Sequence, residues 1–70
     1  MQKRSLTIAG HHTSIALEPE FWAALESLAA RRGLRLTALI EQIDRTRQTS
    51  NLSSALRLAA LRDAQSHSEI

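Results

Sequence analysis

The segment from Thr13 to Phe21 constrains the fold most, because it predicts a β-strand that continues directly into an α-helix. Thr13, Ile15 and Leu17 alternate with small or polar residues, which is the two-residue period of a strand with one buried face. Pro19 follows, and its fixed φ and missing N–H suit the first turn of a helix and end a strand. The strand is short, so it needs a partner.

The length and composition limit what that partner can be. The 70 residues make a single small domain, and a chain this short buries a small fraction of its surface, so we expect a homodimer or a larger oligomer. The absence of cysteine excludes disulfides and a thiolate zinc site. Because no apolar run approaches the roughly 18 residues of a membrane span, we expect a soluble cytoplasmic protein without a membrane partner.

The net charge of +2 is unevenly placed along the chain. Lys3 and Arg4 precede the first acidic residue, and three arginines cluster within residues 31–35. From Leu36 onward four arginines balance four acids. A local basic surface is the electrostatic footprint of nucleic-acid binding, although a basic domain can also simply be soluble.

Residues 3–8 form a second alternating segment, with Leu6 and Ile8 on one face. This pattern predicts a strand joined to the first one by a two-residue turn at Gly10 and His11, of the type that prefers Gly in its first position. The alternative is that residues 1–12 form a mobile basic arm. The turn predicts that Leu6 lies opposite Ile15 and Ile8 opposite Thr13.

Three helices are predicted after the strand from apolar residues that recur every three or four positions. Gly33 ends the first of them, and Ser50 or Asn51 caps the third. Trp22 is predicted to pack in the core or in a subunit interface, since large aromatic side chains dominate burial. The first two predicted ranges are 19–32 and 36–47, the third helix lies within residues 48–64, and a polar, frayed tail follows at 65–70.

The order of strand, helix, Arg-Gly corner and helix resembles the ribbon-helix-helix family of DNA-binding proteins. The resemblance rests on residues 13–21, on the Arg31-Arg32-Gly33-Leu34 stop and on Thr37-Ala38-Leu39-Ile40. It implies a mainly α fold with a short β ribbon, in which residues 13–47 form the core of an intertwined two-fold dimer and residues 48–64 add a third helix. The whole chain resembles a bacterial subgroup with an added N-terminal strand or arm.

The resemblance also implies how the chain binds double-stranded DNA. One strand from each subunit pairs antiparallel, and the outer face of this ribbon enters the major groove. The outward residues of the strand are the candidates for reading bases: His12, Ser14 and Ala16. The resemblance places phosphate contacts at the start of the second helix, at Arg35, Leu36 and Thr37, and the basic charge near the first residues adds Lys3 and Arg4 as candidates.

In the family's arrangement, the apolar residues of the strand and of the first two helices form the core of the dimer. The sequence leaves open whether residues 51–61, rather than 36–47, are the family's second helix, and whether the third helix completes a dimer or joins dimers. The expected dimer core contains Ile15, Leu17, Phe21, Trp22, Leu25, Leu39, Ile40 and Ile43.

We therefore predict a sequence-specific DNA-binding homodimer that regulates transcription. The alternative is a non-enzymatic module that uses the same dimer to dock a partner protein. We expect no enzyme, since His11, His12 and His67 share no recognisable spacing with a nucleophile and a base. Adjacent His11 and His12 point to opposite sides of a strand, so we predict neither a metal site nor a cofactor.

Overall fold

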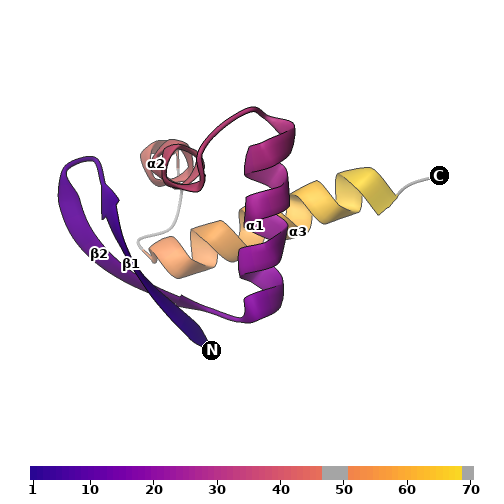
Figure 1. Ribbon diagram of the computed structural model, residues 1–70. Coiled ribbons are helices and arrows are strands. Elements are labelled where there is room, and N and C mark those ends of the chain that lie inside the picture. Colours follow the sequence, from indigo (N-terminus) through magenta and orange to yellow (C-terminus); the bar gives the residue numbers. More distant parts are fainter. Residues whose placement is uncertain (47–50, 69–70) are drawn as a thin grey trace.

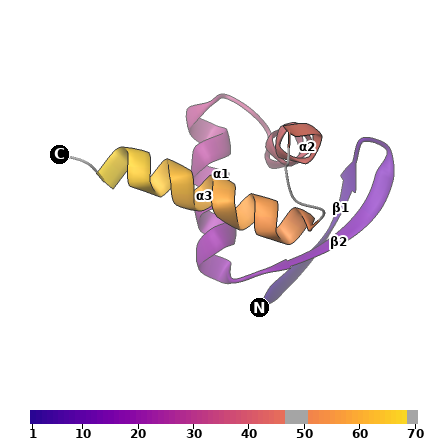
Figure 2. The same ribbon diagram turned by 180° about the vertical axis from the view of Figure 1, so that it is seen from behind.

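A computed structural model describes residues 1–46 and 51–68 and shows a β-hairpin followed by three helices (Figure 1). The open end of the hairpin lies near the start of the first helix, and its turn lies near the second helix. The third helix crosses the first, behind it in Figure 1 and in front of it in Figure 2. The elements are β1 Gln2–Ile8, β2 His11–Leu17, α1 Pro19–Arg31, α2 Leu36–Thr46 and α3 Leu52–Ser68.

The hairpin contains the second strand as β1, paired with β2, but the predicted turn is wrong. Ala9 and Gly10 form the turn, with φ angles of 51° and 83°, and positive values at both positions are those of a type I′ turn. Leu6 consequently pairs with Thr13 rather than with Ile15. The register differs by two residues, so every side chain still lies on its predicted face, whereas a slip by one would have reversed them.

Helix α1 begins at Pro19 as predicted and ends at Arg31, one residue before the predicted end, with Arg32 as its cap. The Leu34 N–H donates to the Ala29 carbonyl at 2.9 Å and the Gly33 N–H to the Ala30 carbonyl at 3.1 Å. This is the Schellman pattern, and it requires the left-handed φ of 68° that Gly33 adopts. The corner between α1 and α2 is therefore a defined backbone structure.

The other helices follow the prediction closely. Helix α2 ends at Thr46, and the predicted last residue 47 lies outside the described residues, as do the predicted break at 48–50 and its alternative cap Ser50. The Asn51 side chain caps α3 by accepting the Ser54 N–H at 3.2 Å. Helix α3 continues to Ser68, so residues 65–68 are helical rather than frayed, and residues 69–70 lie outside the described part.

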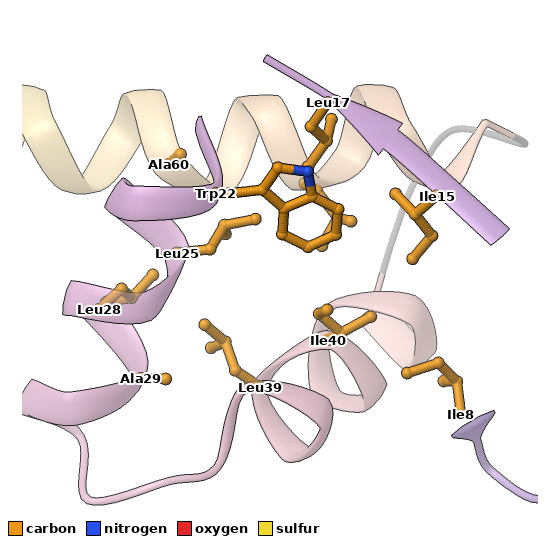
Figure 3. Packing of buried hydrophobic residues seen from close by; sticks show 11 residues of the cluster. Ile8, Ile15, Leu17, Trp22, Leu25, Leu28, Ala29, Leu39, Ile40 and Ala60 are labelled. Carbon is orange, nitrogen blue, oxygen red and sulfur yellow. The ribbon is translucent and has the colours of Figure 1, made fainter. Parts of the chain in front are cut away.

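The apolar core is closed within a single chain (Figure 3). Trp22 lies at its centre with 1% exposure, facing Ile15 and Leu17 of β2. Helix α3 contributes Leu56 and Ala60 to the same cluster. The residues predicted for the dimer core lie here: Ile15, Leu17, Trp22, Leu25, Leu39 and Ile40 are buried, and Phe21 and Ile43 pack at the margin.

These residues pack within a single chain, and their role in holding two subunits together stays a prediction. Strand β2 is not a lone strand, because β1 of the same chain pairs with it along its whole length. Leu17, Leu25, Leu39, Ile40 and Leu56 are each 0% exposed without any partner chain. Burial of these side chains therefore gives no argument for an obligate dimer.

Candidate nucleic-acid interface

The outer face of the hairpin is a polar surface supplied by both strands. Alternate residues of β1 and β2 point away from the helices, and all of them are exposed except Ala16, which is half-buried. The paired positions follow from the register: Lys3 opposite Ala16, Ser5 opposite Ser14, and Thr7 opposite His12. We call these six residues the outer face. The three candidates from the sequence thus lie together, joined by three residues of β1.

Two cross-strand pairs organise the outer face. The hydroxyl oxygens of Ser5 and Ser14 are 3.5 Å apart. Nearer the turn, Thr7 Oγ1 lies 3.4 Å from His12 Nδ1. Hydroxyl and imidazole groups both donate and accept hydrogen bonds, and such groups read base edges in a groove.

The charge on this surface favours an anionic partner. Residues 1–17 contain Lys3 and Arg4 and no acidic residue. Lys3 is exposed on the outer face. A surface that presents hydroxyl groups and an ammonium group, but no carboxylate, does not repel a phosphate backbone.

Arg4 lies on the opposite face of the ribbon, against α1. Its guanidinium stacks 4.6 Å above the centre of the Trp22 ring and pairs with Glu26 at 3.4 Å. The Trp22 indole N–H donates to the Gln2 carbonyl at 2.8 Å. Arg4 thus helps to fix the open end of the hairpin on α1, and the position predicted for a phosphate contact is occupied by intramolecular contacts.

The turn of the hairpin is held by α2. The Ala9 N–H donates to Glu41 Oε2 at 2.8 Å. This charge-assisted bond offsets the cost of placing Ala9, a residue with a Cβ, in the left-handed region at φ 51°. Because Glu41 belongs to α2, the same helix carries the predicted phosphate contacts and fixes the tip of the ribbon.

Removal of the Glu41 carboxylate should loosen the turn. We expect Glu41→Ala to lower the free energy of unfolding by about 1.5–3 kcal/mol, the usual contribution of a hydrogen bond to a charged group. Urea unfolding measures this change, and amide hydrogen exchange should show faster exchange at Ala9. Glu41→Gln is the matched control, because its amide oxygen still accepts the bond; equal losses in both variants would contradict a role as acceptor.

The start of α2 has the features of an anion site. Arg35 is exposed and its carbonyl accepts the Leu39 N–H at 3.0 Å, so Arg35 is the cap residue. Leu36 and Thr37 follow in the first turn, where backbone N–H groups have no partner within the helix. The nearby Arg31 is engaged with Asp63 of α3. Arg35 is the cation best placed at this helix end.

Helix α3 is tied to the junction between β2 and α1. Arg57 binds both carboxylate oxygens of Glu18, at 3.0 and 3.4 Å, and lies 5.9 Å from the centre of the Phe21 ring. A backbone hydrogen bond at Glu18 itself lowers the pKa of its carboxyl, and the hydrogen bond from Arg57 lowers this pKa further. Arg57 is half-buried and fixes α3 against the ribbon junction.

The part of the chain that the structure describes offers neither a metal-ligand cluster nor a membrane-spanning helix. It contains no group of three His, Cys, Asp or Glu side chains able to hold a metal ion. No helix among the described residues combines the length and apolarity needed to cross a bilayer.

The hairpin turns one polar face outward, and the three helices lie beneath its other face. This arrangement defines a helical domain that presents a β-ribbon. The ribbon-helix-helix domain matches residues 1–64, and the chain belongs to this family. The family generally comprises DNA-binding transcription regulators that form dimers, and its fold is regulatory rather than enzymatic.

The chain is also similar to a solved structure, that of an uncharacterized protein from Bordetella pertussis Tohama I. The two share 40% sequence identity and superpose with a TM-score of 0.77. The match covers 91% of this chain and 55% of the other, so this chain spans about half the length of that protein. No curated protein matches the sequence.

Proposed function

We propose that this protein is a sequence-specific DNA-binding homodimer that regulates transcription in the bacterial cytoplasm. The observation that carries the proposal is the outer face, where exposed hydroxyl, imidazole and ammonium groups stand on a two-stranded ribbon without a carboxylate. A major groove admits a ribbon of two strands, and side-chain donors and acceptors then reach the base edges. Membership in a family of DNA-binding regulators supports the same function.

In the proposed complex, strand β2 reads the bases and the start of helix α2 binds a phosphate. His12 and Ser14 contact base edges, and Ala16 offers apolar contact to a thymine methyl group. Arg35 and the first N–H groups of α2, at Leu36 and Thr37, bind a phosphate beside the groove. The contact between Glu41 and Ala9 supports this division, because it holds the ribbon tip against the same helix.

The width of a four-stranded sheet limits how two subunits can bind one DNA site. Adjacent strands are about 4.8 Å apart, so a sheet of four strands, formed if β2 paired with its copy, spans about 14 Å between its outer strands. A major groove is about 12 Å wide. We therefore propose that each subunit inserts its own hairpin into one half-site, which predicts a palindromic target.

Selection of binding sites from random duplex DNA by the purified protein tests the proposal directly. We expect an enriched palindrome, and an affinity that falls steeply as salt increases, since each neutralised phosphate releases counterions. Salt-insensitive or undetectable binding to every duplex would instead favour a module that docks another protein. The observation that favours docking of another protein is the exposure of two apolar side chains on α3, Leu58 at 44% and Leu61 at 48%.

Two single substitutions separate reading from positioning. Ser14→Ala should weaken binding to the selected site by about 1 kcal/mol or more and leave random DNA unaffected, because base contacts specify. Arg35→Ala should weaken binding to all sequences alike and reduce the salt slope by about one. Fluorescence anisotropy over a range of salt concentrations measures both effects. Equal losses on specific and random duplexes for both variants would contradict base reading by the ribbon.

A further inference from the structure

We infer that β1 supplies two further specificity-determining residues, Ser5 and Thr7, so that the DNA-reading surface extends over both strands of the hairpin. The inference rests on the proposed DNA-binding function and deepens it. The family resemblance assigned base reading to the strand that precedes the first helix, which is β2. The structure places β1 beside it in the same chain, with the outward residues of both strands in register.

The outward side chains of both strands lie on one exposed face. Ser5 and Thr7 are exposed on the same face as Ser14 and His12, and the polar atoms of each pair are 3.5 and 3.4 Å apart. A two-stranded ribbon about 4.8 Å wide between backbones lies well inside a groove of about 12 Å.

The pair of Thr7 and His12 makes a specific chemical prediction. The Thr7 hydroxyl engages His12 at Nδ1, which leaves Nε2 of the ring for a base. In a neutral imidazole one ring nitrogen donates and the other accepts, and the partner of one nitrogen selects the role of the other. Because the Thr7 hydroxyl can donate to Nδ1 or accept from it, the contact is compatible with both tautomers, and Thr7 acts by orienting the ring so that Nε2 is the nitrogen presented to the DNA.

Strand β1 is held firmly enough to read bases. Its open end is fixed by the bond from the Trp22 indole to the Gln2 carbonyl, at 2.8 Å. Its other end is fixed by the bond from the Ala9 N–H to Glu41, also at 2.8 Å. Side chains on a strand held at both ends need little further ordering when DNA binds, which preserves affinity and selectivity.

The experiment compares the same substitution on the two faces of the ribbon. Thr7→Val removes the outward hydroxyl but keeps the size and branching of the side chain. Thr13→Val is the control, because Thr13 is half-buried on the inner face opposite Leu6. Each variant and the wild-type chain are used to select sites from random duplexes, and binding is measured on the wild-type site with each base pair replaced in turn.

We expect Thr7→Val to reduce discrimination about fivefold or more at one base pair of each half-site. His12→Ala should affect the same base pair, and the double variant should lose no more than the single ones, because the two residues act as a unit. Ser5→Ala should reduce discrimination at the same base pair of the half-site as Ser14→Ala does. Thr13→Val should retain the wild-type preference at every position.

The outcomes distinguish this inference from the proposed function. If Ser14→Ala changes the preferred site but Thr7→Val and Ser5→Ala do not, the ribbon reads DNA through β2 alone and the inference is wrong. If the wild-type protein selects no sequence, the proposed function fails and the inference fails with it. Circular dichroism of each variant, expected to match that of the wild-type chain because Ser5 and Thr7 are exposed, excludes unfolding as the cause.

Discussion

The substitution Ile15→Asp should unfold the chain, whereas Ser14→Asp at the neighbouring position should leave it folded. Ile15 is 2% exposed in the core, while Ser14 is exposed on the outer face. Loss of the buried isoleucine costs about 1.5–3 kcal/mol, and placing an unpaired carboxyl group in an apolar core adds a penalty of several kcal/mol. A domain of this size is stable by only about 3.5–10 kcal/mol.

Far-UV circular dichroism and urea unfolding measure this difference. A folded Ile15→Asp chain with near-normal stability would contradict the position of Ile15 in the core. Because the core closes within one chain, a wild-type chain diluted until the proposed homodimer dissociates should still be folded and unfold cooperatively in urea. Loss of the folded signal on dilution, before urea is added, would instead show that folding requires a second subunit.

The two faces of the hairpin were predictable from the sequence, but its turn was not. Alternation assigned Ile15 and Leu17 inward and Ser14 outward, and a shift by two residues preserves that assignment. The turn was predicted one residue late because Ala9 rarely adopts the positive φ that a type I′ turn requires. The compensating partner is Glu41, 32 residues away, and sequence periodicity carries no signal for such a contact.

The candidate site was predicted in part, for a similar reason. His12 and Ser14 followed from the outward period of β2. Ser5 and Thr7 carry the same period on β1, but their cross-strand partners depend on a register that the sequence predicted two residues away from the observed one. Arg4 was assigned to DNA from its charge alone. It shares the inward parity of Leu6 and Ile8, which was the available signal that it packs against the helices.

The core of α1 shows where helical periodicity loses precision. The sequence predicts both Phe21 and Trp22 for the core, whereas Trp22 is 1% exposed and Phe21 is half-buried. Neighbouring residues of a helix are about 100° apart, so the direction of a wide apolar face depends on what packs against it. Here α3 and the hairpin both contact α1, and the indole N–H finds its acceptor in β1.

The burial of Trp22 predicts the largest loss from removal of a single side chain. We expect Trp22→Ala to lower the free energy of unfolding by about 3–5 kcal/mol, the range for a buried aromatic residue. Besides leaving a cavity, the change removes the donor to the Gln2 carbonyl and the ring beneath Arg4. Stacking on a DNA base is excluded for this side chain, because 1% exposure leaves it no open face.

Trp22→Phe is the matched variant that separates burial from anchoring of the ribbon. Phenylalanine retains most of the apolar contact but has no N–H, so we expect a smaller loss of about 1–2 kcal/mol. Amide hydrogen exchange should then increase along β1 near Gln2, while the amides of α2 remain protected. Uniform exchange across the chain in Trp22→Phe would show that the indole supports the core as a whole and does not anchor β1. Local exchange confined to β1 would instead identify Trp22 as the contact that fixes the open end of the ribbon on α1.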